Sequence, residues 1–189
     1  MNPVAALLVV LVTARSSLGG ITIAIPEGWR RLDSVEMKVL KVELDPQNRL
    51  QRRLKGQADG PPPLIVMKHD VPGTIAASIQ VFLNPIPAEM RYASSIELTR
   101  VIAFATMATF RGEYEVQPHE TTVGDLPAAE WVAHYTLVET GGSHAMRTRN
   151  IIVARGDTFY LVGYTGPAND TADFDSFDAV VKSIQFVRK

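Results

Sequence analysis

Apolar and polar positions alternate along the second half of the chain, from Tyr114 onward. A period of two is typical of β-strands that turn one face towards a core. Dipeptides containing glycine interrupt the pattern at 124–125, 141–142 and 156–157. Turns this short connect only antiparallel neighbours. The sequence therefore predicts an antiparallel meander of four strands, at 114–123, 128–139, 144–155 and 158–165.

Shorter apolar runs predict further strands around this meander. The first run is followed by Pro26-Glu27-Gly28, a turn after which Trp29 is expected to fold back onto the core. The breaks between the runs are too short to be domain linkers. We therefore expect a single domain over residues 20–189, with additional strands at 21–25, 64–69, 77–83 and 183–187.

A helical period replaces the alternation between residues 94 and 112. Ser94 and Glu97 form the pattern of a capping box, in which each side chain satisfies the backbone amide of the other residue. Gly112 is expected to end this helix in the left-handed conformation. Because apolar residues recur at helical spacing, we expect the helix to lie across the sheet with one side buried. These residues are Leu98, Val101, Ile102, Ala105 and Ala108.

Two more helices are predicted. Asp45-Pro46 is typical of an N-cap followed by proline at the first helical position, and that helix would end at Gly56. The other begins around 170–173, where acidic residues favour a helix N-terminus, and would bury Phe174, Phe177 and Val181. Helices at separated points of an antiparallel meander indicate an α+β fold, with one antiparallel sheet and helices packed on its faces.

The N-terminus has the pattern of a secretory leader. Val4 to Val12 are nine apolar residues without a break, which is too short to span a bilayer and suits the apolar core of a signal peptide. Small residues at Ser17 and Gly19 would allow cleavage after Gly19, so residues 1–19 are the expected leader. No Lys or Arg precedes the apolar run, and a buried strand or short helix is the alternative.

Composition and charge exclude several kinds of site and of partner. The 189 residues include no cysteine, which excludes disulfides, thiol nucleophiles, cysteine-based zinc sites and lipid attachment through an N-terminal cysteine. The 19 Lys and Arg residues are balanced by 20 Asp and Glu residues. This balance provides no basic field for nucleic acid, so we expect no nucleic-acid partner.

No motif of the chain predicts a catalytic, cofactor-binding or metal-binding residue. The four histidines lack the i, i+4 spacing of a helical metal site, and neither a nucleophile elbow nor a glycine-rich phosphate loop is present. His134 alternates with Val132 and is interpreted as a half-exposed strand residue. The pairs Glu113/Glu115 and Asp173/Asp175 are interpreted as a solvated face and a helix start.

One basic cluster stands out on the expected strand 144–155. Arg147 and Arg149 share one face of that strand, and His144 lies near its beginning. Clustered guanidinium groups bind carboxylates or phosphates through paired hydrogen bonds. The alternative is an exposed face that keeps the sheet soluble. The candidate binding residues are therefore His144, Arg147 and Arg149.

Several stretches resemble a known superfamily. They are a strand ending in Ile25-Pro26-Glu27-Gly28-Trp29, the capped helix 94–110, the turn sequence Gly124-x-Leu126-Pro-Ala128-Ala129, the paired strands 147–154 and 158–164, and the C-terminal stretch Phe177–Phe186. In this order they are similar to the PsbP-like superfamily, named for an extrinsic protein of photosystem II. The resemblance covers about residues 21–187 and implies an α/β/α sandwich around a central antiparallel sheet.

The resemblance also implies a type of role. Members are mostly small extracytoplasmic proteins that bind or help assemble larger complexes, and they are generally not enzymes. Mycobacterial lipoproteins of the LpqN type are similar, but the cysteine that anchors them is missing here, which favours a free secreted protein or one held by an uncleaved leader. The superfamily has no shared catalytic set, so the resemblance assigns no functional residue.

We therefore expect a secreted or periplasmic, non-enzymatic accessory protein that binds a protein partner or an envelope component, with no cofactor and no transmembrane span. Two alternatives remain. One is a cytoplasmic chaperone or adaptor, since the superfamily also resembles chaperones of type VI secretion effectors. The other is an enzyme whose site is too dispersed along the chain to be recognised from motifs.

Overall fold

The computed structural model describes residues 14–33, 36, 64–68, 75–139 and 142–187. Its centre is a seven-stranded sheet with the spatial order β3-β4-β5-β9-β8-β7-β6, in which every neighbouring pair is antiparallel. The strands are β3 (Trp29–Arg31), β4 (Leu64–Lys68), β5 (Ser78–Pro85), β6 (Glu113–Val123), β7 (Leu126–Glu139), β8 (Gly142–Arg155) and β9 (Thr158–Pro167). The predicted four-strand meander is confirmed as β6 to β9.

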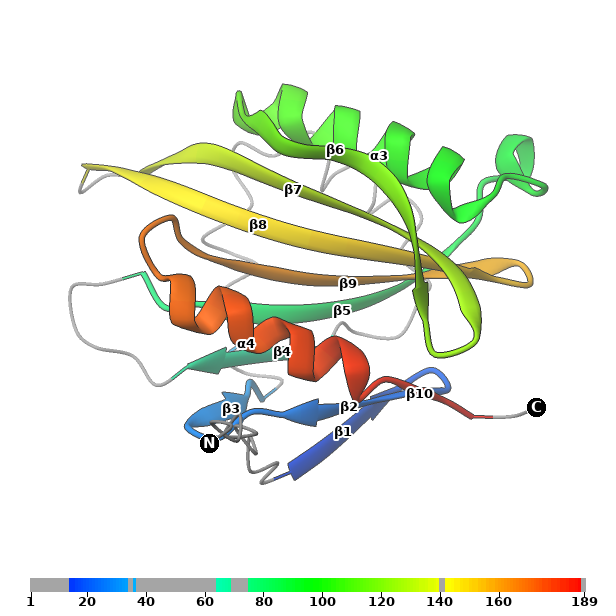
Figure 1. Cartoon of the computed structure of the whole chain (residues 1–189), viewed down its shortest axis with the longest axis horizontal. Helices are drawn as coiled ribbons and strands as arrows, with labels where there is room; N and C mark the ends of the chain where they lie inside the picture. The colour runs from blue at the N-terminus through cyan, green and yellow to red at the C-terminus, as the bar shows by residue number, and fades with distance from the viewer. Residues whose placement is uncertain (1–13, 34–35, 37–63, 69–74, 140–141, 188–189) are drawn as a thin grey trace, which may run out of the picture.

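A small second sheet lies beside this one (Figure 1). It has the order β1-β2-β10 and consists of β1 (Ala14–Leu18), β2 (Ile21–Ile25) and β10 (Gln185–Phe186). Strand β2 is central, so the two ends of the described chain meet on either side of it. The predicted strands 21–25 and 183–187 are confirmed, the latter in shortened form.

Helix α3 (Ser95–Phe110) packs against β6, β7 and β8. It follows a short 3-10 helix, η1 (Ala88–Met90). The predicted capping box is confirmed, because Ser94 accepts from the backbone N–H of Glu97 while the Glu97 carboxylate accepts from that of Ser94. The predicted helix end is wrong by one residue, since Arg111 takes the left-handed conformation with φ of 52°.

Gly112 is required for a different reason. A Cβ atom there would lie 2.6 Å from the carbonyl oxygen of His134, which is shorter than any ordinary contact. The missing side chain therefore lets the chain that leaves α3 pass directly over the backbone of β7. A turn residue and a close-packing residue look the same in the sequence, and only the tertiary structure distinguishes them.

Helix α4 (Thr171–Lys182) packs against β9 and β2 on the other face of the large sheet. Asp170 caps it by accepting from the backbone N–H of Asp173. Phe174 and Phe177 are buried beneath it as predicted, whereas Val181 is half-buried. The third expected helix, Pro46 to Gly56, lies outside the described residues.

Two cores result, one on each face of the large sheet. Neighbouring residues of β7 and β8 alternate between them: Val132 and Ile151 belong to the core beneath α4 and the small sheet, and Trp131 and Ile152 to the core beneath α3. Trp29 joins the first core, as predicted. The architecture is thus the expected α+β arrangement, an α/β/α sandwich with a central antiparallel sheet (Figure 1).

Candidate functional site

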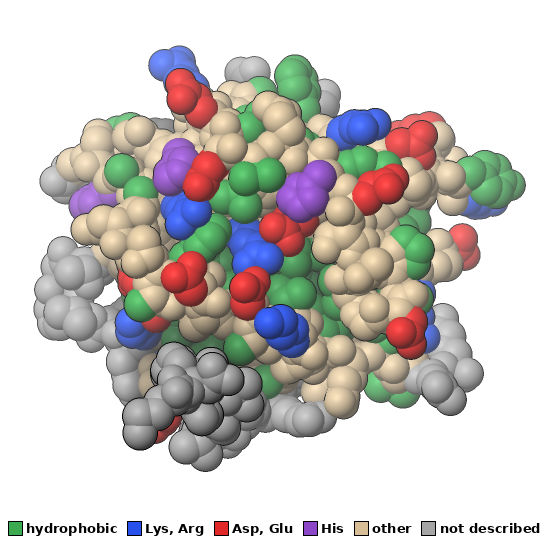
Figure 2. Space-filling model, viewed as in Figure 1, with side chains coloured by type: hydrophobic (Ala, Val, Ile, Leu, Met, Phe, Trp, Pro, Cys, Tyr) green, Lys and Arg blue, Asp and Glu red, His purple; other side chains and the backbone are tan. Residues whose placement is uncertain are grey.

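A strip of charged side chains crosses the face of the sheet beside α4. This helix packs over β9 and leaves the neighbouring parts of β8, β7 and β6 less covered, and acidic, basic and histidine side chains gather there (Figure 2). The strip lies on an open surface instead of inside a cavity. We call it the charged strip, and it consists of Glu115, Glu130, His134, Arg147, Arg149 and Asp178.

The first half of the strip is centred on Glu115 of β6. Arg147 of β8 donates two hydrogen bonds to this carboxylate, from Nε at 2.9 Å and from Nη2 at 2.8 Å. His134 of β7 places its Nε2 3.0 Å from Oε2 of the same group. Three neighbouring strands therefore each contribute one side chain, with His134 and Arg147 directly opposite each other in the ladder.

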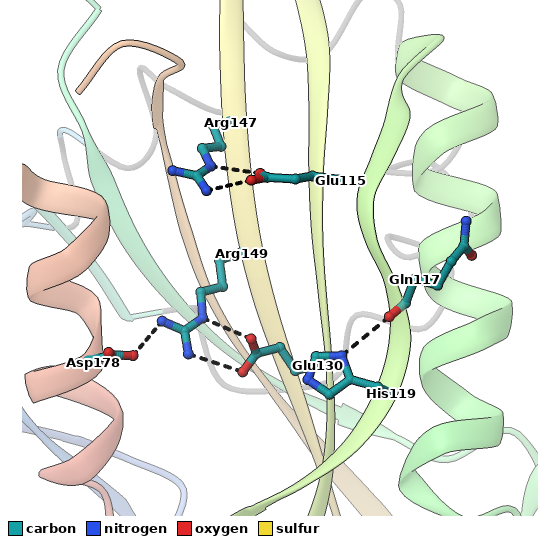
Figure 3. A network of polar contacts seen from close by, with 7 residues as sticks. All are labelled: Glu115, Gln117, His119, Glu130, Arg147, Arg149 and Asp178. Carbon is teal, nitrogen blue, oxygen red and sulfur yellow. Dashed lines mark hydrogen bonds and ion pairs between the residues drawn. The ribbon is translucent and has the colours of Figure 1, made fainter. Parts of the chain in front are cut away.

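The second half is centred on Arg149 of β8. Its Nε and Nη2 donate to Glu130 of β7 at 3.0 and 3.2 Å, and its Nη1 donates to Asp178 of α4. The side chains of Arg149 and Glu130 are 17% and 12% exposed, whereas that of Asp178 is 56% exposed. This half therefore runs from a buried ion pair in the sheet to an exposed one on the helix (Figure 3).

Aromatic rings of α4 support both guanidinium groups. Cζ of Arg147 lies 3.4 Å from the centre of the Phe174 ring, and Cζ of Arg149 lies 5.6 Å from that of Phe177. A guanidinium over an aromatic face is attracted by the ring quadrupole, and its flat shape loses little freedom when it stacks. Each arginine is thus held by an acid on one side and a ring on the other, so contacts within this chain define its position.

The electrostatics of the strip favour fixed charges. The hydrogen bonds from Arg147 lower the pKa of Glu115, with smaller contributions from the charges of Arg147 and His134, although partial burial acts in the opposite direction. Burial acts to lower the pKa of Arg149, but its hydrogen bonds and charge interactions with Glu130 and Asp178 outweigh this and raise it. Groups held charged at neutral pH are poor proton donors and acceptors, so this arrangement suits recognition better than acid–base chemistry.

The structure brings together two of the three candidate residues from the sequence. Arg147 and Arg149 share a face, as predicted, and both take part in the strip. His144 pairs across the ladder with Leu137, and the alternation of β8 directs it to the opposite face from both arginines. His134 lies on the arginine face and its side chain is 46% exposed, as its alternation indicated.

Sequence reasoning missed the acidic half of the strip. Glu115 was interpreted as part of a solvated face, and Glu130 and Asp178 were not singled out. The predicted turn at 141–142 gives no signal for them, because a two-residue turn there would place His134 opposite Arg149, whereas the structure pairs His134 with Arg147. The sequence also holds no signal for Asp178, because the position of this residue depends on how α4 packs on the sheet.

A hollow with a volume of about 450 Å³ lies at the N-terminal end of α3, away from the charged strip. Its lining includes Ser94, Glu120, Thr122 and Asp125. A helix N-terminus attracts anions through its free amides. Here the capping box already occupies such amides, and two acidic side chains line the hollow, so its chemistry does not favour an anion.

Among the described residues, no three His, Asp or Glu side chains are grouped closely enough to hold a metal ion. No helix in the same part of the chain is both long and apolar enough to cross a membrane.

Comparison with known proteins identifies the fold. No protein-family model matches the sequence, and no curated protein does. The solved structure of cyanobacterial PsbP (CyanoP) from Synechocystis sp. PCC 6803 has 9% identity and a TM-score of 0.55, over 92% of this chain and 91% of that one. LpqN, described as involved in cell envelope biogenesis of Mycobacterium tuberculosis, has 11% identity and a TM-score of 0.54, over 89% and 83% of the two chains.

A third solved structure, from Bacteroides thetaiotaomicron VPI-5482, has 10% identity and a TM-score of 0.52. The match covers 90% of this chain and 46% of the longer Bacteroides protein. At sequence identities this low, the similarity shows that the folds are alike and does not show that the functions are. The seven-stranded sheet with α3 on one face and α4 on the other is therefore the PsbP-like fold that the sequence features indicated.

Proposed function

We propose that this chain is a non-enzymatic accessory protein that works outside the cytoplasm and binds a protein partner or an envelope component through the charged strip. The observation that carries this proposal is the double fixation of Arg147, bound by Glu115 and stacked on Phe174 while Glu115 stays 35% exposed. Charges that are already positioned lose little entropy when a complementary surface arrives. The strip would therefore select a partner whose surface carries the complementary pattern of charges.

The polar chemistry of the strip also favours binding over turnover. The hydrogen bonds from Arg147 lower the pKa of Glu115 and keep this carboxylate ionised, and the strip lies on an open sheet face that water reaches. Enzymes that use acid–base chemistry shift the pKa of a catalytic group towards neutral pH and exclude water around that group. The PsbP-like fold is consistent with such a role, and LpqN, one of its similar structures, is involved in cell envelope biogenesis.

A photo-crosslinking experiment tests the binding surface. A benzophenone amino acid replaces His134, which is half-exposed within the strip, and in a matched control it replaces Asp157, which is exposed in the β8–β9 turn. We expect one partner to crosslink at position 134 and not at 157, and the crosslink to disappear with Arg147→Glu. Equal crosslinking at both positions, or a crosslink insensitive to Arg147→Glu, would contradict the proposal.

The location is tested separately by the mass of the native N-terminus. A chain that starts at Gly20 in the extracytoplasmic fraction would support the leader and the location. The cytoplasmic adaptor is the second candidate because Ala14–Leu18, within the expected leader, pairs along its whole length with β2. Intact Met1 in the cytoplasm would favour this candidate and overturn the extracytoplasmic location, while the crosslinking result would still decide the binding surface.

A further inference from the structure

The outward side of α3 carries a regular row of exposed residues. They follow one another at spacings of four, three, four and three, which is the spacing of a coiled-coil seam. All of them are exposed, and α3 turns its other side to β6, β7 and β8 (Figure 1). We call this row the α3 seam, and it consists of Glu97, Val101, Phe104, Ala108 and Arg111.

The middle of the seam is apolar where a surface helix is normally polar. The exposed fraction is 71% for Phe104 and 54% for Val101. The inner side of the same helix buries Leu98, Ala103 and Met107 against the sheet. Helices that are apolar on both sides are typically covered on both sides. The seam therefore has the composition of a contact surface.

The ends of the seam carry opposite charges. Glu97 is in the first turn and Arg111 directly follows the last one, and Phe104 is seven residues from each. Arg111 forms no ion pair with any residue in the described part of the chain. If a second α3 lies antiparallel to the first, with a two-fold axis at Phe104, each Glu97 faces an Arg111 and the two phenyl rings meet. The antiparallel helix dipoles also attract each other.

We propose that α3 is the interface of a symmetric dimer, in which the seams of two copies of this chain pack antiparallel around Phe104. A second copy fits because the seam is complementary to itself: rotation by 180° exchanges its acidic and basic ends, as an isologous interface requires. The charged strip lies on the opposite face of the sheet, so both copies would keep it free for a partner.

The small area of the α3 seam determines how strong a dimer we expect. One helix pair buries less than the roughly 1,600 Å² of a standard interface. We therefore expect a reversible dimer with a dissociation constant in the micromolar range, visible as a sedimentation coefficient that rises with protein concentration. Its two ion pairs lie at the rim, so dimerisation should weaken as the salt concentration increases.

Complementary charge reversals provide the test. Glu97→Arg places arginine against arginine in the homodimer, and Arg111→Glu places glutamate against glutamate. In a mixture of the two variants, arginine at 97 of one copy faces glutamate at 111 of the other, and the second pair keeps its natural charges. Analytical ultracentrifugation should show each variant alone dimerising at least tenfold more weakly than the natural chain, and the equimolar mixture recovering the dimer.

Two controls keep the result interpretable. Thr109→Glu adds a charge at an exposed α3 position beside the seam and should leave dimerisation unchanged. Phe104→Ser removes the centre of the seam at an exposed site, so the chain should keep its circular dichroism spectrum and melting temperature while the dimer is lost. A natural chain that stays monomeric at 1 mM, a mixture that restores nothing, or a Phe104→Ser variant that still dimerises would each overturn the proposal.

Discussion

The two faces of the large sheet are covered in different ways. Beneath α3 the core is apolar, with Leu98, Met107 and Trp131 packed together, and the helix continues apolar on its outer side. Beneath α4 the aromatic contacts of Phe174 and Phe177 border directly on ion pairs. The small sheet shares this second core, so α4 covers only part of the face.

This difference separates two kinds of surface. On the α4 face, charges are paired within the chain and remain accessible, which suits recognition of a different molecule by its charge pattern. On the α3 side, Arg111 at the end of the exposed apolar seam has no ion pair within the described residues and would gain one only from a second copy. The same sheet would thus present a partner-binding face on one side and a self-association face on the other. The predictions below test whether the two sides are as distinct as this comparison indicates.

The largest effect is expected from the buried ring beneath α4. Phe177 is fully buried, and Phe177→Ala should lower the free energy of unfolding by about 3–5 kcal/mol through lost burial and a residual cavity. Urea denaturation measures the change. The matched control is Phe104→Ala on the outer side of α3, where the ring is 71% exposed and the monomer should change by about 0.5 kcal/mol or less. Similar losses of unfolding free energy in the two variants would contradict the placement of Phe177 in the core and of Phe104 on the surface.

The next effect tests how α3 is joined to the sheet. In Gly112→Ala the new methyl group would meet the carbonyl oxygen of His134 at 2.6 Å, and the backbone must move to relieve the contact. We expect a loss of about 1–3 kcal/mol in the free energy of unfolding. Gly124→Ala is the comparison, because its Cβ meets nothing within 4 Å and only its φ of 57° opposes the change. A neutral Gly112→Ala variant would show that the chain leaves α3 along another path.

Breaking the ion pair between Arg149 and Glu130 on the α4 face should have an effect of similar size on the free energy of unfolding. Arg149→Met leaves Glu130 without its two hydrogen bonds at a site where its side chain is only 12% exposed. An unpaired buried carboxylate costs about 2 kcal/mol or more. The double variant Arg149→Met/Glu130→Gln should recover part of that loss in thermal denaturation. Additive losses from the two single changes would indicate that the residues do not interact.

The smallest effect concerns pH. The folded pKa of Glu115 is lowered, chiefly by the hydrogen bonds from Arg147, so its ion pair stabilises the fold above the unfolded pKa of about 4.3. This contribution is lost as pH falls below that value through the lower folded pKa. Arg147→Met should therefore make stability less sensitive to acid in this range, by less than about 1 kcal/mol because the carboxylate is one-third exposed. An unchanged slope in the acid-unfolding curve, relative to an exposed control such as Arg91→Met, would contradict the pairing.

Much of the fold was predictable because its signals are local. The capping box of α3 involves residues three positions apart, and the meander of β6 to β9 follows from alternation and short turns. The two arginines shared a face for the same reason, since alternation along β8 decides it. Gly112 was misread because its function depends on His134, a residue on a strand that follows later in the chain.

The candidate sites were harder to predict, because they depend on contacts between residues far apart in the sequence. Glu115 and Arg147 are 32 residues apart, and their contact requires β6, β7 and β8 to be neighbours in register. The register of β6 against β7 shifts twice, between Tyr114 and Val116 and between Val116 and His119, so counting from the turn does not locate Glu115. The expected buried side of α3 was wrong in part, since Val101 and Ala108 are exposed and Ala103 and Met107 are buried instead. This helix is apolar nearly all round, so its periodicity does not decide which side faces the sheet.

The sequence by itself determined the class of fold, the order of its strands in the meander and the positions of both described helices. These properties follow from hydrophobic periodicity, caps and turns, which act over a few residues. The tertiary structure alone decided that arginines and acids from three strands and a helix form one strip, and that Phe104 remains outside. Ion pairing and burial depend on which surfaces meet, and that is set by the packing of the whole chain.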